Sequence, residues 1–97
     1  MIVREDLPRG VQSAMLVHAA GESSPGNLKD GTYAFVLSVP NEEALMVVAA
    51  KLIRARVAFV TVFEPDAPYN GQLMALGVIP ARKEDLRKHL SALPLLK

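Results

Sequence analysis

Two carboxylates, Glu64 and Asp66, directly follow the most apolar segment of the chain, residues 57–63. This segment is rich in β-branched and aromatic residues, which is typical of a strand covered on both faces, and Asn70-Gly71 favours a turn soon after it. Open α/β sheets bind ligands where such strands end. A carboxylate at that edge can act as a general base. Asp66 can equally serve as a turn former, and both interpretations remain open at this point.

A second polar group follows the N-terminal apolar residues. Asp6 comes after a short segment, 1–4, that is expected to be a strand, and Arg9 and Gly10 begin a helix expected over 9–20. If the first strand runs parallel to the apolar strand, Asp6 lies at the same edge as the carboxylates described above. The unpaired N–H groups of the helix, together with Arg9, can then hold a phosphate.

The two histidines are weaker candidates. His18 shares a helix face with Met15 and can be either a packing residue or a base, whereas His89 lies one turn after Asp85 and is expected to be a solvated partner. The helix rises about 12 Å between its first turn and His18, which argues against direct contact with Asp66. No histidines and carboxylates share metal-ligand spacing, so we expect no metal site.

Hydrophobic periodicity and turn residues predict the elements that position these side chains. In chain order we expect a strand at 1–4, a helix at 9–20, a strand at 32–39, a helix at 42–54, strands at 57–63 and 72–79, and a helix at 82–93. The strand–helix–strand order predicts that 32–39 and 57–63 pair in parallel through a right-handed crossover. The following loop is short and contains no helix, so 72–79 is expected to return antiparallel beside 57–63.

Composition limits the possible classes of protein. The 97 residues suit a single domain over 1–97, and 51% hydrophobic against 22% charged residues is enough to bury a core. The net charge of +1 gives no overall attraction to nucleic acid or membranes, and the absence of cysteine excludes disulfides and thiol chemistry. Without a membrane-spanning apolar run or a signal-peptide pattern, we expect a cytoplasmic protein with no membrane partner.

Several short motifs, in the same order along the chain, resemble the second class of peptidyl-tRNA hydrolases. The opening Val3-Arg4-Glu5-Asp6-Leu7-Pro8-Arg9-Gly10 and the later His18-Ala19-Ala20 are similar to that family's V-R-x-D-L segment and A-A-Q-x-x-H-A helix. Glu64-Pro65-Asp66-Ala67 resembles its D-A-G loop, and residues 75–80 and 93–97 resemble its L-G-I-G-P strand and its C-terminal motif. The short loop after Asp66 is closer to the divergent peptidyl-tRNA hydrolase-domain proteins.

The resemblance implies a three-layer α/β/α domain with a mixed, mostly parallel four-stranded sheet, no cofactor, and commonly a homodimer. It also implies a hydrolase in translation that cleaves the ester between a peptide and the tRNA 3′ end, with Asp66 and His18 at the catalytic positions. The candidate substrate-binding residues are Arg4, Asp6, Arg9, Gly10 and Asn70. Basic residues that can line an RNA track are Arg4, Arg9, Lys51, Arg54, Arg56, Arg82 and Lys83.

Three positions depart from the family pattern. Val11 stands where the hydrolases have a lysine, Met15 stands where they have a glutamine, and no threonine follows Asp66. Loss of one such polar group in a catalytic site lowers the rate by about 10²–10³. A catalytically silent RNA-binding or protein-binding module on the same fold is therefore the alternative to an enzyme.

Overall fold

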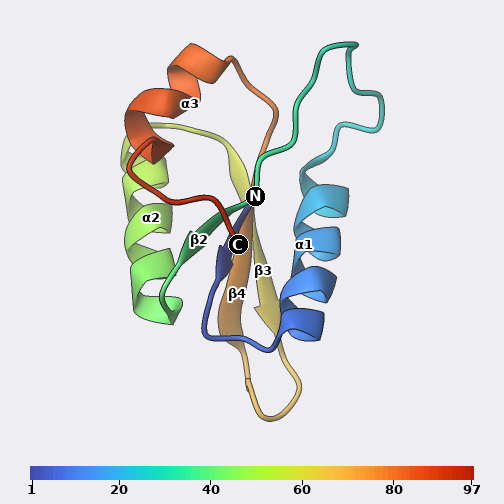
Figure 1. Ribbon diagram of the computed structural model, residues 1–97, viewed down its shortest axis with the longest axis vertical. Helices are drawn as coiled ribbons and strands as arrows, with labels where there is room; N and C mark the ends of the chain where they lie inside the picture. Colours follow the sequence, from blue (N-terminus) through green and yellow to red (C-terminus); the bar gives the residue numbers. More distant parts are fainter.

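Four strands form one mixed sheet in the order β2-β1-β4-β3, and three helices pack against it (Figure 1). The structure, a computed structural model, describes residues 1–97. The elements are β1 (Ile2–Arg4), α1 (Arg9–Ser23), β2 (Leu37–Val39), α2 (Glu42–Arg54), β3 (Phe59–Glu64), β4 (Gln72–Val78) and α3 (Lys83–Leu90). Each expected element is therefore present. No helix is long and apolar enough to cross a membrane.

The strand β2 is shorter than expected, because only Leu37–Val39 of the segment 32–39 pairs with another strand. Its partner β1 is itself only three residues long, and only Met1 precedes it: the Met1 carbonyl accepts from the Leu37 N–H and the Met1 amino group donates to the Phe35 carbonyl, each at 2.8 Å. Tyr33 and Phe35 stay exposed in the connection. Local apolar content alone therefore predicted too long a strand.

The predicted parallel pairing of 32–39 with 57–63 is wrong. The strand β2 pairs in parallel with β1, and β1 and β3 each pair antiparallel with β4, so β1 and β4 lie between β2 and β3. One of the three neighbouring pairs is parallel, and the sheet is mixed rather than mostly parallel in its pairing. The antiparallel return of β4 beside β3 is confirmed.

The two inner strands are β1 and β4, and β3 lies at the edge of the sheet. Five consecutive residues of β4, 73–77, are buried, whereas Val62 is the one buried residue of β3 and Phe63 is 54% exposed. The expectation that 57–63 is covered on both faces is therefore wrong. The apolar residues of β3 lie on an edge strand whose two faces are only partly buried. The local sequence of such a strand looks the same as that of a fully buried strand.

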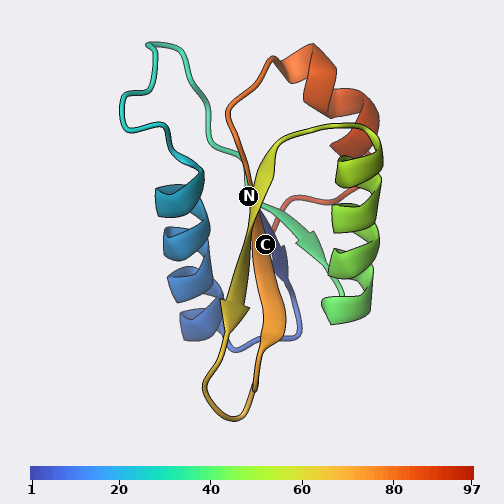
Figure 2. The same cartoon turned by 180° about the vertical axis from the view of Figure 1, so that it is seen from behind.

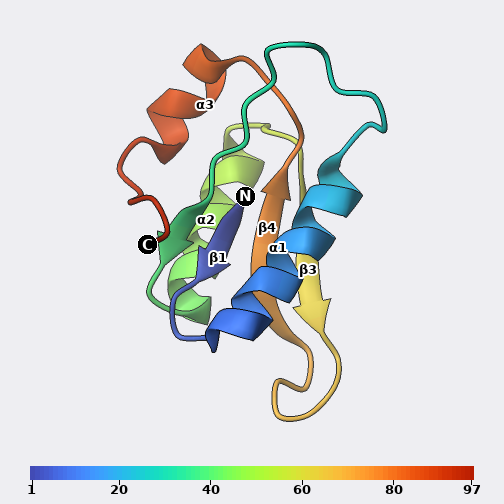
Figure 3. The ribbon, with the colours of Figure 1, turned by 45° about the vertical axis from the view of Figure 1, so that its right-hand side comes forward.

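Helix α1 lies on one face of the sheet, and α2 and α3 lie on the other (Figures 1 and 2). On the α2 face, the core contains Ile2, Val39, Leu45, Val48, Leu52, Leu73, Leu76 and Leu90. On the α1 face, it contains Val3, Leu7, Met15, Ala19, Val62, Met74 and Ala75. Figure 3 shows α1 running across β4 and β3.

Gly77 on β4 determines how closely α1 approaches the sheet. A Cβ atom at Gly77 would lie 2.5 Å from the backbone oxygen of Ala19 and 3.0 Å from the side chain of Ser23. Real Cβ atoms do not come this close to a backbone oxygen, so the contact requires glycine. The C-terminal half of α1 is consequently seated directly on β4.

Candidate functional site

The C-terminal ends of β1, β2 and β3 meet at one edge of the sheet, together with the first turns of α1 and α2 (lower part of Figure 1). Both β1 and β3 run antiparallel to β4, so they run in the same direction and Asp6 and Asp66 follow strands that end at this edge. The residues 65–71 connect β3 to β4 there and are called the hairpin loop below.

A buried hydrogen-bond network centred on Arg4 forms the floor of this edge. Its guanidinium donates from Nε and Nη2 to the two carboxylate oxygens of Asp6, at 2.8 and 2.9 Å. Its Nη1 donates to Gln72 Oε1 at 2.9 Å and to the Leu73 carbonyl at 3.1 Å. Arg4 therefore joins the segment that leads into α1 to the segment that leaves the hairpin loop.

The network shifts the pKa values of its two charged members in opposite directions. The hydrogen bond to Asp6 raises the pKa of Arg4, and the same bond from Arg4 holds the pKa of Asp6 below its ordinary value. The side chain of Arg4 is 8% exposed and that of Asp6 is 40% exposed. Both groups are already paired with each other, so neither offers a free charge to a ligand.

Two further carboxylates at this edge are also occupied by structural hydrogen bonds. Glu42 at the start of α2 accepts from the backbone N–H of Leu73 at 2.8 Å. Glu5 accepts from the hydroxyl of Ser38 at 2.5 Å. These bonds fasten α2 and β2 to the same floor, whereas the Glu64 carboxylate accepts only from the backbone N–H of Asp66 and the carboxylates of Glu43 and Asp66 accept no hydrogen bond.

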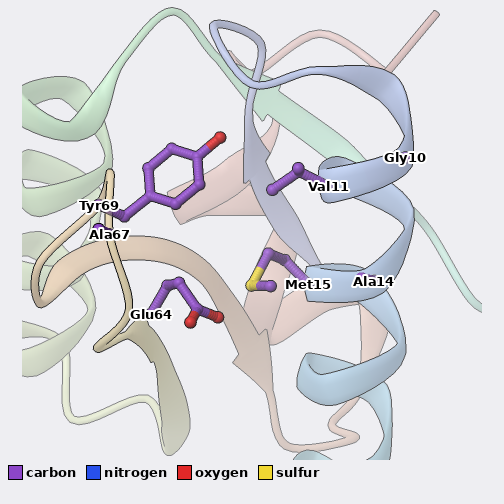
Figure 4. A pocket seen from close by; sticks show the side chains of 7 residues that line it. All are labelled: Gly10, Val11, Ala14, Met15, Glu64, Ala67 and Tyr69. Atoms are coloured by element: carbon purple, nitrogen blue, oxygen red, sulfur yellow. The ribbon is translucent and has the colours of Figure 1, made fainter.

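A cleft of about 260 Å³ opens between the N-terminal half of α1 and the hairpin loop (Figure 4). It is lined by Gly10, Val11, Ala14, Met15, Glu64, Ala67 and Tyr69. The side chains of Val11 and Met15 point from α1 toward the ring of Tyr69 and the carboxylate of Glu64 on the other side (Figure 4). The cleft is therefore mostly apolar, with one carboxylate and one phenol in its lining. We call it the α1–hairpin cleft.

Glu64, which sequence analysis noted but did not select, supplies that carboxylate. Val62 packs into the core beneath α1, and Glu64 lies two residues further along the same strand, so it faces the same side. A register shift between Val62 and Phe63 places an extra residue, Met74, in β4 and increases the local twist. Period-two alternation from Val62 is the signal that could have identified Glu64.

Asp66 shapes the hairpin loop through its backbone. Its carbonyl accepts from the N–H groups of Tyr69 and Asn70, each at 3.0 Å, and its own N–H donates to Glu64 Oε1 at 3.2 Å. Asn70 and Gly71 adopt φ values of 48° and 90°, which asparagine and glycine tolerate best. The Asp66 side chain is exposed, makes no hydrogen bond and does not line the cleft.

His18 lies outside the cleft as well. It is exposed, and the buried stripe of α1 consists of Met15, Ala19 and Ser23. The expected buried face that joined His18 to Met15 is therefore wrong, because the close contact with Gly77 rotates Ala19 and Ser23 toward the sheet. His89 is half-buried on α3, and α3 lies at the opposite end of the molecule from this edge (Figure 1).

The other predicted binding residues are divided between the cleft and its surroundings. Gly10 lines the cleft, and Arg9 is exposed at the first position of α1. The first intrahelical hydrogen bond runs from the Gln12 N–H to the Pro8 carbonyl, so the N–H groups of the preceding three helix residues have no helical acceptor. Asn70 is exposed, and its amide donates to the Pro68 carbonyl of the same loop at 3.3 Å.

The predicted basic track is not assembled beside the cleft. Arg4 is buried in the network, and Arg9 is the one member of the track exposed at the cleft edge. Because α2 begins at the cleft edge and β4 also begins there, the residues at their C-terminal ends and beyond lie toward the opposite edge of the sheet. These residues are Lys51, Arg54, Arg56, Arg82 and Lys83.

No group of three or more histidine, aspartate or glutamate side chains is arranged to bind a metal ion. Comparisons with known proteins find no family model and no curated protein that match this chain.

Proposed function

We propose that the chain is a peptidyl-tRNA hydrolase-like domain that binds the 3′ end of a peptidyl-tRNA in the α1–hairpin cleft and hydrolyses its ester. The supporting observation is that Glu64, the last residue of β3, lines the cleft together with Gly10 and Val11 of the first turn of α1, and that Asp66 follows two residues later in the hairpin loop. The placement of α1 on one sheet face and of α2 and α3 on the other is compatible with the three-layer α/β/α arrangement of that family.

Ester hydrolysis needs a base for the attacking water and donors for the developing oxyanion. In this proposal Asp66 takes a proton from water, and the resulting hydroxide attacks the ester carbonyl carbon. The unpaired N–H groups at the start of α1 stabilise the oxyanion. The carbon–oxygen bond to the ribose then breaks, and the ribose oxygen receives the proton from the carboxyl group, which restores the free enzyme.

The apolar lining has a separate role in the proposed complex. Tyr69 offers an aromatic face on which an unpaired base of a single-stranded tRNA end can stack. Val11 and Met15 supply the opposite wall, which accommodates an apolar group without a specific charge. Glu64 lies in the same lining and is the competing candidate for the base.

A peptide-release assay with peptidyl-tRNA tests the proposal and separates the two carboxylates. We expect Asp66→Asn to lower the rate by about 10²-fold or more, as is typical for loss of a general base, and Glu64→Gln to have a smaller effect. Glu22→Gln, an exposed carboxylate change on α1 outside the cleft lining, is the matched control. A larger loss for Glu64→Gln would transfer the role to Glu64, and an inactive wild type would refute hydrolysis.

The second candidate function is a catalytically silent binding module on the same fold. It is favoured by the mostly apolar lining of the cleft and by the exposed Asp66 side chain, which lies outside that lining. RNA binding without hydrolysis, with an affinity that falls by about one logarithmic unit per phosphate contact for each tenfold rise in salt, would support an RNA-binding module. Absence of RNA binding would instead favour a protein ligand.

A further inference from the structure

No other element lies against the outer face of α2 (Figures 1 and 2), although exposed side chains on that face are apolar. The inner face packs into the core through Leu45, Val48 and Leu52. On the outer face, Met46 is 56% exposed and Val47 and Ile53 are each 67% exposed, with exposed Ala50 between them. A helix that is apolar on both sides is normally covered on both sides.

Charged residues lie at the two ends of this outer stripe. Glu43, Val47, Ala50 and Arg54 follow one another at spacings of four, three and four residues, so they lie along one line of the helix surface. The chain's one ion pair joins Arg4 to Asp6, so Glu43 and Arg54 have no charged partner within the molecule. The stripe therefore has a negative N-terminal end, an apolar centre and a positive C-terminal end.

We propose that this stripe is the contact surface between two copies of the chain, with the two α2 helices antiparallel across a twofold axis. In this register Glu43 of one copy faces Arg54 of the second copy, and Val47 faces Ala50 of the second copy. A twofold axis repeats each contact, as closed symmetric dimers require. The small side chain of Ala50 lets the helix axes approach closely, because interaxial distance depends on the side chains at the contact.

The charge pattern selects both the occupant and its orientation. A parallel pair of α2 helices would bring Glu43 against Glu43 and Arg54 against Arg54, whereas the antiparallel pair matches opposite charges at both ends. A groove of about 500 Å³ beside α2, with Val47, Leu93 and Pro94 in its lining, continues the apolar surface. The stripe is thus complementary to itself.

This inference goes beyond the proposed function and does not depend on it. The α1–hairpin cleft lies on the α1 side of the sheet, and the outer surface of α2 faces away from the opposite side. One helix face and its margin form a small contact beside the roughly 800 Å² per partner of a standard interface, so we expect a reversible dimer whose population depends on concentration. Association can be measured whether or not the chain is a hydrolase.

Sedimentation velocity of the full chain over a wide concentration range provides the first test. We expect wild type to shift from monomer to dimer, and Ala50→Asp to remain monomeric at every concentration because it buries an unpaired charge at the centre of the contact. Val17→Asp is the matched control, since Val17 is 73% exposed on α1 and should leave the dimer unchanged. Circular dichroism establishes that both variants remain folded.

Charge reversal tests the antiparallel register. Glu43→Arg and Arg54→Glu, studied separately, each place two like-charged contacts in the dimer and should weaken association by about tenfold. An equimolar mixture of the two variants should form a heterodimer close to wild-type affinity, because both contacts again join opposite charges. A monomeric wild type, a dimer that tolerates Ala50→Asp, or a mixture that associates no better than its components would overturn the proposal.

Discussion

The Arg4 network and the α1–hairpin cleft share one edge of the sheet but use their polar groups in opposite ways. In the network, the guanidinium of Arg4 is buried and bonded to Asp6, Gln72 and the Leu73 carbonyl. In the cleft, Glu64 and Tyr69 face open space across from apolar side chains of α1. The first region is closed and satisfied, and the second can accept a ligand.

The comparison shows that a residue that resembles the hydrolase motif is not necessarily free to contact a ligand. Arg4 and Asp6 are two of the residues that resemble the hydrolase motif, yet they are already paired with each other. Val11 and Met15, which depart from the motif, are the residues that form the cleft wall. Arg4 and Asp6 therefore hold the edge of the site in position, and the side chains that face a ligand in the cleft are those that differ from the motif.

The largest predicted effect is the loss of the network by Arg4→Met. This change leaves Asp6 and Gln72 without their buried partner, and it should lower the free energy of unfolding by about 3 kcal/mol in urea denaturation. Arg4→Lys keeps the charge but not the two-pronged bond, so its loss should be smaller. Arg9→Met, at an exposed position on the same edge, should change stability by less than about 0.5 kcal/mol. Equal losses in the free energy of unfolding for Arg4→Met and Arg9→Met would mean that the buried network contributes no more to stability than an exposed arginine.

A second prediction concerns the anchoring of α1, whose other end forms the cleft wall. Gly77→Ala would place a methyl group 2.5 Å from the Ala19 carbonyl oxygen, and α1 must move to relieve the contact. We expect a loss of about 1–3 kcal/mol in the free energy of unfolding. Gly21→Ala is the matched control, because a Cβ there meets nothing within 4 Å and alanine favours helix by about 0.5–1 kcal/mol. If Gly77→Ala were as stable as wild type, α1 would not be fixed against β4.

The elements whose limits depend on local chemistry were predictable from sequence. Helix α2 begins as expected because Asn41 accepts from the Ala44 N–H at 2.9 Å and caps it, while Glu42 and Glu43 suit its first turn. The order of the strands was not predictable, because the runs in β3 and β4 are similarly apolar and their neighbours are chosen by contacts far apart in sequence. The short β1 gave no sign that it would occupy the centre.

The candidate site likewise has features that could be predicted from the sequence and features that could not. The shared edge for Asp6 and Asp66 was predicted on the condition that the first strand runs in the same direction as 57–63, and the antiparallel pairing of both strands with β4 meets that condition. Period-two alternation places Glu64 on the same side of β3 as Val62, but which side of β3 faces α1 is a property of the folded sheet. The exposure of His18 depends on the rotation of α1 that Gly77 allows. Neither can be derived from spacing along the chain.

The smallest predicted effect is a dependence of stability on acid pH that originates in the network. The hydrogen bond from Arg4 lowers the pKa of Asp6 in the folded state below its ordinary value of 3.8. Its stabilisation is therefore fully present above that value and is lost as pH falls through the lower folded-state pKa. We expect the urea midpoint of wild type to fall more steeply between about pH 5 and about pH 2 than that of Asp6→Asn. Asp66→Asn, which removes a carboxylate without a hydrogen bond, should keep the wild-type slope. If Asp6→Asn had the wild-type slope as well, the carboxylate of Asp6 would be no more engaged than that of Asp66, and the contrast between the closed network and the open cleft would fail.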